Sequence, residues 1–359
     1  MKKYCKEITN RNFRGGLRSI LALTVLMMVF DACQRRLLEY DEIYPAALIP
    51  VQIDWNATGF IVSGNNRDVH KVSIRFFPKD GIGEVFDCYL ETNVSQGEIA
   101  VPTGKYSVIV FNESLQDATF WAGRIAFTDV NSYSDFTANA VLLSDAARLQ
   151  QFPYYQPQPG EIFIVEPLRL ASWSLPDFEV TNNMILVSQG QRPPSILTAE
   201  ENTMFNALTQ ITMRALTRPI GVTARVENLS SARTMYFAMQ GLASKVNMAT
   251  GLATTPSTYL FILNGRQYES NQRNGTAQSS FLSFGRTPTP ESYKIGADIL
   301  LTSNELYDPA PPLLFDVTDE FNNTNISINL NINIVLPFIE GGIAVDDWGV
   351  DEQRTVKEY

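Results

Sequence analysis

The strongest constraint on the fold is a strict alternation of apolar and polar residues near the C-terminal end of the sequence. The stretch NISINLNINIVLP, residues 325–337, has the period of two that is typical of a β-strand with one face on a core and the other in water. We therefore expect its apolar face to belong to the core of a β-sheet domain. The side chains on that face are Ile326, Ile328, Leu330, Ile332, Ile334 and Leu336.

Shorter stretches of the same kind recur along the chain. They are rich in β-branched and aromatic residues and are separated by turn signals at residues 78–81, 102–104 and 264–265. In one of them, KYSVIVFN, we expect alternate residues to be buried, with Val108 in the core. The set is KVSIRFFP, KYSVIVFN, EIFIVEP, GVTARVEN, STYLFILNG and YKIGADILL. Many short strands with such turns predict an all-β chain of antiparallel β-sandwiches.

Helical pattern is scarce, and its best instance follows the densest group of breakers in mid-chain. That group is GQRPP at residues 190–194. Just after it, Thr198 is a candidate N-cap with Glu201 at capping-box spacing. About 327 residues remain once a signal peptide is removed, a length that favours two domains. We predict an N-terminal sandwich over residues 46–190, a linker over 191–207 and a C-terminal sandwich over 208–359.

The first 32 residues have the layout of a secretory signal peptide. A basic segment leads into an apolar run, Ile20–Phe30, which at about 1.5 Å per residue covers only half of a ~30 Å hydrocarbon core. Small Ala32 then precedes Cys33, as in the lipoprotein box of bacteria. We predict a signal peptide over residues 1–32, acylation (palmitate) of Cys33 and a lipidated tether over 33–45. The alternative is an ordinary cleaved signal with an incidental cysteine.

The charge balance after the signal peptide argues against nucleic acid as a partner. Residues 1–32 hold six of the 28 basic and two of the 38 acidic residues, so 22 basic and 36 acidic residues remain, a net charge of −14. That sign is wrong for a protein that binds nucleic acid or anionic lipid headgroups.

The reactive side chains are too few for most kinds of catalysis. His70 is the single histidine, and its polar surroundings predict a solvated residue. Cys88 is the cysteine that remains once residues 1–32 are removed and Cys33 is acylated, and we expect it to be a buried small hydrophobe. This inventory supplies neither a Cys/His metal site nor a choice of base for a Ser-His-Asp triad. We predict a protein that is not an enzyme and has no metal and no cofactor.

A loop rich in aromatic residues is a candidate ligand contact. It has the sequence QFPYYQPQPG and contains Tyr154 and Tyr155. Exposed tyrosines there would contact a glycan or a protein partner. The alternative is that the loop covers the end of a sandwich.

Seven short motifs in a fixed order carry a family resemblance across nearly the whole chain after the signal peptide. The sequence resembles Bacteroidetes lipoproteins related to fimbrial anchor subunits, the fimbrillin-associated type, which include a branch known as a domain of unknown function. The motifs are VQIDW, SIRFFPKDG, EIAVPTGKYSVIVFN, QGLASKVNMATG, FLSFG, LLFDVTDEF and AVDDW.

This resemblance implies two transthyretin-like β-sandwich domains and a lipoprotein of the cell outer membrane. The implied role is an anchor or accessory subunit of type V fimbriae in cell adhesion and pilus assembly, with fimbrillin-like pilus subunits as partners. A carbohydrate-binding surface lipoprotein of a polysaccharide-uptake system is the alternative. It would need a shallow site lined by polar and aromatic side chains, such as Trp121, Tyr154, Tyr155 or Trp173. Acidic Glu39, Asp41 and Glu42 favour surface export, whereas Arg35 and Arg36 precede them, so the side of the membrane stays open.

The resemblance also gives the alternating strand at residues 325–337 two candidate roles. Subunits of type V pili exchange strands, so a long strand near the C-terminus is either donated to a neighbour or kept as a core strand. We favour the core strand because residues 337–359 supply enough chain to return and pair beside it.

Overall fold

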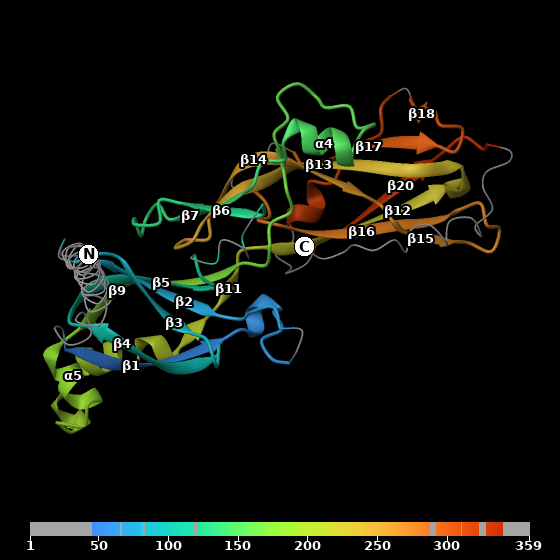
Figure 1. Ribbon diagram of the computed structural model, residues 1–359. Helices are drawn as coiled ribbons and strands as arrows, with labels where there is room; N and C mark the ends of the chain where they lie inside the picture. The colour runs from blue at the N-terminus through green and yellow to red at the C-terminus, as the bar shows by residue number, and fades with distance from the viewer. Residues whose placement is uncertain are drawn as a thin grey trace, which may run out of the picture. The chain divides into compact units, whose positions relative to one another are not determined.

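The computed structural model describes residues 45–339, except 65–66, 80, 82, 116, 118–120, 122, 288–291, 310 and 323–327 (Figure 1). The described chain is all-β, as the sequence predicts. The strands are β1 Ala46–Asp54, β2 Val72–Pro78, β3 Phe86–Leu90, β4 Gln96–Pro102, β5 Gly104–Asn112, β6 Ile125–Thr128, β7 Thr137–Ala140, β8 Phe163–Ile164, β9 Ala171–Val180, β10 Ile211–Thr212, β11 Arg214–Ala215, β12 Arg218–Glu227, β13 Ala232–Asn247, β14 Ala253–Ile262, β15 Gly265–Tyr268, β16 Gly275–Ser283, β17 Lys294–Leu301, β18 Leu306–Tyr307, β19 Leu314–Asp316 and β20 Ile328–Val335.

The strands form four sheets. Their orders are β10-β1-β4, β11-β9-β5-β2-β3, β15-β16-β12-β20 and β18-β17-β13-β14-β8, the last of which is an eight-stranded sheet that also holds β6, β7 and β19. Most pairs with a described register are antiparallel, but β1 with β10, β14 with β8 and β12 with β20 run parallel. The two strands of each parallel pair are far apart in sequence, so the long connection between them permits a parallel arrangement. A tight hairpin would force the two strands to be antiparallel.

The described helices are short. They are α4 Asp145–Gln151, α5 Asn182–Ser188 and α6 Ala199–Phe205, with 3-10 turns η1 Asn56–Thr58, η2 Pro194–Ile196, η3 Ala207–Thr209, η4 Leu229–Ser231 and η5 Asp319–Asn322. The predicted capping box begins α6: Glu201 N donates to Thr198 Oγ1 (3.1 Å), and Thr198 N donates to Glu201 Oε2 (2.9 Å). These bonds satisfy two amides that a helix start leaves open.

The described residues fall into two compact units. The smaller unit comprises residues 45–49, Ile99–Gly104 and Glu179–Phe205, and the larger unit comprises the remaining described residues. Strands β6, β7 and β8 precede residue 190 in sequence, yet they pair within the sheet of β13 and β14. The domain limits that we place at residues 190 and 208 therefore remain a proposal.

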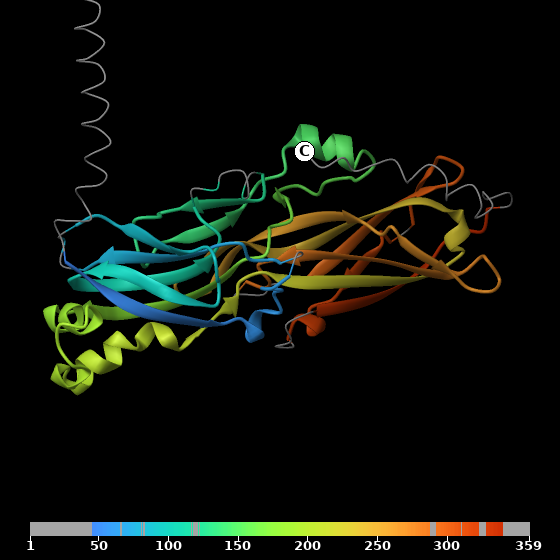
Figure 2. The ribbon, with the colours of Figure 1, turned by 60° about the horizontal axis from the view of Figure 1, so that its bottom comes forward.

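The main core of the larger unit lies between the four-stranded and the eight-stranded sheets, which we call the second sandwich. Alternate residues of β12, such as Val222, face odd-numbered residues of β13, such as Phe237, and both side chains are fully buried. In the middle of β13, before the bulge at Gly241, Tyr236 and Ala238 point the other way, where Tyr236 packs with Phe152 and Leu260. Helix α4, green in Figures 1 and 2, ends at that outer layer. Strand β13 is thus buried on both faces.

Strand β5 differs from the expected alternation. Every residue from Tyr106 to Asn112 is buried, not only the set that includes Val108. The reason is a second buried cluster, in which Ile109 and Phe111 pack with Phe136 and with Val246 of β13. Because this cluster covers the second face of the five-stranded sheet, β5 has no water-facing side.

Candidate functional site

The alternating strand lies in a sheet of its own chain. Strand β20 pairs in parallel with β12, with Cα partners from Ile220 and Ile328 to Glu227 and Val335. In the described part of the chain, β20 ends the order of the four-stranded sheet, so its other edge faces away from β12. Residues 340–359, which we expect to pair beside it, lie outside the described residues.

The two faces of β20 differ as the sequence predicts. Leu330 is fully buried, and Ile332, Ile334 and Leu336 are 4%, 2% and 2% exposed within the core of the second sandwich. Asn329, Asn331 and Asn333 are exposed on the opposite face. Ile326 lies outside the described residues, and Ile328 begins the strand.

The C-terminal end of β20 is held by hydrogen bonds to the last residue of β12 and to the segment that follows it. Leu336 N donates to Glu227 O (3.1 Å), and Asn228 Nδ2 donates to Leu336 O (2.7 Å). Farther along, Ile339 N donates to Ser231 Oγ (3.1 Å). These contacts fix the register of a strand whose apolar face already selects it.

The candidate tyrosines do not form a shared surface. Tyr154 is 43% exposed, and its ring lies 6.0 Å from that of Tyr236. Tyr155 is buried, and its hydroxyl donates to the carboxylate of Glu161 at 3.1 Å. Burial and the neighbouring Glu161 raise the pKa of Tyr155. Of the pair, Tyr154 alone presents a ring to solvent.

The other singled-out side chains have ordinary surroundings. The His70 side chain is 54% exposed, with Nδ1 3.4 Å from Glu113 Oε1. Cys88 is half-buried, and burial raises the pKa of its thiol to about 12, so it stays protonated at neutral pH. Cys33 lies outside the described residues. Within residues 45–339 as described, no helix is long and apolar enough to span a membrane, and no cluster of three or more potential metal ligands occurs.

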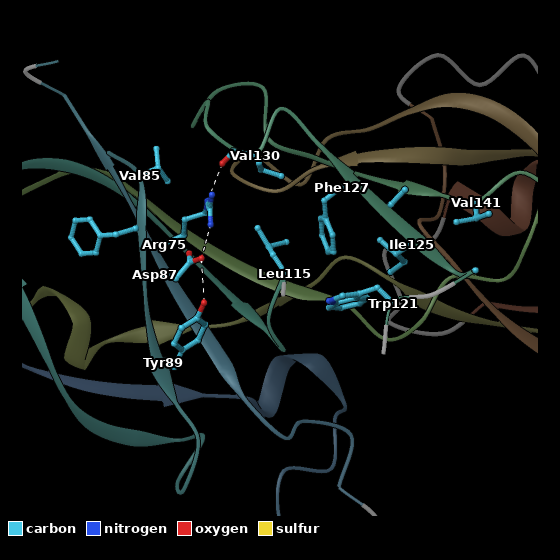
Figure 3. A pocket seen from close by; sticks show the side chains of 13 residues that line it. Arg75, Val85, Asp87, Tyr89, Leu115, Trp121, Ile125, Phe127, Val130 and Val141 are labelled. Atoms are coloured by element: carbon cyan, nitrogen blue, oxygen red, sulfur yellow. Dashed lines mark hydrogen bonds and ion pairs between the residues drawn. The ribbon is translucent and has the colours of Figure 1, made fainter. Parts of the chain in front are cut away.

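A cavity that the sequence analysis missed lies on the face of the five-stranded sheet next to its edge strand, β3. Its volume is about 820 Å³. Arg75 of β2 and Asp87 of β3 meet there, with Arg75 Nη1 2.6 Å from Asp87 Oδ2 and side chains 9% and 11% exposed (Figure 3). The lining residues are Arg75, Val85, Phe86, Asp87, Tyr89, Leu115, Trp121, Gly123, Ile125, Ala126, Phe127, Val130 and Val141.

A hydrogen-bond chain runs along one wall of this cavity, as the dashed lines of Figure 3 show. Arg75 Nε donates to Val130 O (2.9 Å), and the Tyr89 hydroxyl donates to Asp87 Oδ2 (3.4 Å). Burial raises the pKa of Tyr89, which keeps its hydroxyl a donor. The ring of Trp121 meets that of Phe127 edge to face, with centroids 5.1 Å apart. The cavity therefore combines one ion pair with apolar and aromatic walls.

Comparison with known proteins identifies the family. The family described as "Domain of unknown function (DUF5119)" matches residues 32–261. The chain belongs to this family. One curated relative, "Putative fimbrium anchoring subunit Fim4B" of Bacteroides ovatus, is 30% identical over 125 residues, which are 34% of this chain and 33% of that protein. The match thus spans about a third of the length of that relative. Both findings confirm the resemblance drawn from the sequence.

Solved structures of low sequence identity are also similar. A "putative adhesin" from Bacteroides ovatus has a TM-score of 0.49 and 16% identity, covering 83% of this chain and 95% of that chain. "The fimbrial anchor protein Mfa2 from Porphyromonas gingivalis" has a TM-score of 0.42 and 11% identity, covering 81% of this chain and 90% of that chain.

Proposed function

We propose that this DUF5119 protein is an outer-membrane lipoprotein that acts as an anchor or accessory subunit of type V fimbriae. The observation that carries the proposal is the 30% identity over 125 residues to a protein named as a fimbrium anchoring subunit. The all-β fold supports it, because an anchor needs a rigid body and sheet edges rather than a reaction centre. The role is structural and not catalytic.

The lipid anchor is the part of the proposal that the N-terminal sequence supports. The basic segment, the apolar run and Cys33 together resemble a lipoprotein signal. Stable anchoring needs more than one acyl chain, as a diacylated or triacylated cysteine provides, because each buried methylene contributes about 0.8 kcal/mol. Attachment through residue 33 leaves residues 34–45 as the tether to the first strand.

Strand β20 stays in its own chain under this proposal, and the edge that it leaves unpaired within the described residues is the contact for a fimbrillin-like subunit. An edge strand presents N–H and C=O groups that a partner strand completes by β-augmentation. Val335, the last residue of β20, is 59% exposed and supplies apolar surface at the end of this strand. The buried face of β20 then holds the second sandwich together while the outer edge binds.

Substitution of the lipid-bearing cysteine tests the anchor. Cys33→Ser removes the thiol that is acylated, so we expect no palmitate labelling and release of the protein from the outer-membrane fraction. Cys88→Ser is the matched control and should leave labelling unchanged. Undiminished labelling of Cys33→Ser would refute the lipoprotein assignment.

Capture of the unmodified protein from outer membranes tests the fimbrial role. We expect fimbrillin-like subunits to accompany it, and we expect the Cys33→Ser protein to recover fewer of them. Recovery of polysaccharide-uptake proteins in place of pilus subunits would overturn the fimbrial assignment and favour the carbohydrate alternative.

A further inference from the structure

The carboxylate in the cavity beside β3 has one oxygen without a partner. Asp87 Oδ2 accepts from Arg75 Nη1 (2.6 Å) and from the Tyr89 hydroxyl (3.4 Å). Asp87 Oδ1 is buried and accepts no hydrogen bond from the protein. Buried acceptors in native proteins are nearly always satisfied, so an unsatisfied carboxylate oxygen beside a cavity indicates a donor that comes from outside the chain.

The neighbouring guanidinium determines what kind of donor fits. Arg75 compensates the charge of Asp87, so the wall has no net negative charge to offset the desolvation of an ammonium group. A neutral donor is therefore favoured over a cation. Arg75 uses three of its five N–H groups, on Asp87, on Val130 O and on Asn131 Oδ1 (3.4 Å). The wall thus offers a free acceptor next to free donors, which matches a hydroxyl group because a hydroxyl both donates and accepts.

The remaining walls of the cavity indicate the size and polarity of the rest of the ligand. Leu115, Trp121 and Phe127 lie to one side of the ion pair in Figure 3, and Val130 and Val141 complete an apolar surface. A volume of about 820 Å³ is within the range of about 300–1,000 Å³ that is usual for small-molecule sites. A ring with one apolar face and a hydroxylated edge fits such walls.

We propose that this cavity binds a neutral carbohydrate ring. A ring hydroxyl donates to Asp87 Oδ1 and accepts from Arg75, while the C–H face of the ring packs on the half-buried side chains of Leu115 and Phe127. The site is separate from the Tyr154 loop. The proposal is also independent of the fimbrial role, which is tested by whether pilus subunits are captured with the protein. It would give an anchored subunit a glycan contact of its own.

The test uses the unlipidated protein, residues 34–359, with methyl α-mannopyranoside, methyl α-glucopyranoside, N-acetylglucosamine and fucose as probes in saturation-transfer NMR. We expect at least one probe to bind with a millimolar dissociation constant, and Arg75→Met/Asp87→Leu to weaken that binding by about tenfold or more. The paired substitution removes both charges together, because a single one would leave its partner buried and alone. Absence of transfer to all four probes, or unchanged binding by the folded double variant, would overturn the proposal.

A second measurement keeps the test valid if the double variant fails to fold. Trp121 lines the cavity, so binding should change its fluorescence, and Trp121→Phe should remove that change while saturation transfer persists. A fluorescence change that survives in Trp121→Phe would place binding elsewhere and overturn the proposal. Loss of binding in Tyr154→Ala alone would overturn it in favour of the loop.

Discussion

Truncation of one side chain in β20 tests whether the strand belongs to its own sandwich. Leu330 is fully buried, opposite Val222 of β12 in the parallel register. Leu330→Ala removes its transfer free energy and leaves a cavity between two sheets, so we expect the free energy of unfolding to fall by about 2–5 kcal/mol. Whole domains are stable by only about 5–15 kcal/mol, so this one change removes a large share of the total.

The assay is urea denaturation of residues 34–359, followed by circular dichroism. Asn331→Ala is the matched control, because Asn331 is the next residue along the strand and is exposed on the opposite face. We expect the control to change the free energy of unfolding by less than about 0.5 kcal/mol. Equal effects of the two substitutions would refute the burial of this face in solution.

Removal of the whole strand extends the same prediction. A chain truncated after Thr324 loses four buried apolar residues of β20 and its end, each contributing roughly 1.5–3 kcal/mol. We expect the shortened chain to aggregate and to bind a hydrophobic dye, while residues 34–359 remain monomeric in size-exclusion chromatography. A soluble, monomeric and cooperatively folded truncated chain would show that the strand is dispensable to its own domain and available for donation.

Three further predictions concern the rest of the fold. Val108→Asp places a charge in a fully buried layer, so we expect a loss above ~4 kcal/mol, seen as insoluble expression or no thermal transition. Gly241 has φ +91° in the bulge of β13, where a Cβ would lie 2.9 Å from Ser292 O. Gly241→Ala should therefore lower the free energy of unfolding, measured in urea, by at least about 1 kcal/mol more than the control Gly160→Ala, because Gly160 also has a positive φ but no atom near its Cβ position. Hydrogen bonds from Thr198 lower the pKa of the Glu201 carboxyl, so the carboxylate stabilises the fold at neutral pH, and this contribution is lost as the pH falls through the lowered pKa. In urea denaturation, Glu201→Gln should therefore have a lower free energy of unfolding than the unmodified protein at pH 6, and the two values should converge in acid.

The sequence predicts the buried side chains of a strand best where the other face of that strand is exposed to solvent. The polar asparagines of β20 mark its exposed side, and the buried set follows from the period of two. The expected alternation of buried and exposed residues is wrong for β5. Its sequence, KYSVIVFN, has apolar residues at adjacent positions, and the second face of the strand is covered by Phe136 and by residues of β13, which are far away in sequence. The pattern of a single strand shows the polarity of its two faces, but it does not show which other parts of the chain cover those faces.

The cavity beside β3 could not be predicted because its two charged residues become partners through strand register. Arg75 and Asp87 stand opposite each other in the β2–β3 pairing and share one face, yet each looks like an isolated charge within an apolar run. A charged residue amid β-branched and aromatic neighbours is the one signal that the sequence offered. Similarly, Tyr154 and Tyr155 are adjacent in sequence but differ in exposure, because they lie in a turn closed by Tyr155 N donating to Phe152 O (3.2 Å), which the sequence analysis did not foresee.

The parallel pairing of β20 has a consequence for the order in which the protein folds. Asn228 and Leu336, which close the end of this pairing, are 108 residues apart. Contacts of such long range form late, because the intervening chain must lose its entropy before they contribute. During synthesis, β12 and β13 emerge long before β20, so the apolar groove between them is uncovered in the nascent chain. This uncovered groove is therefore a part of the nascent chain that needs protection by a chaperone until β20 has formed.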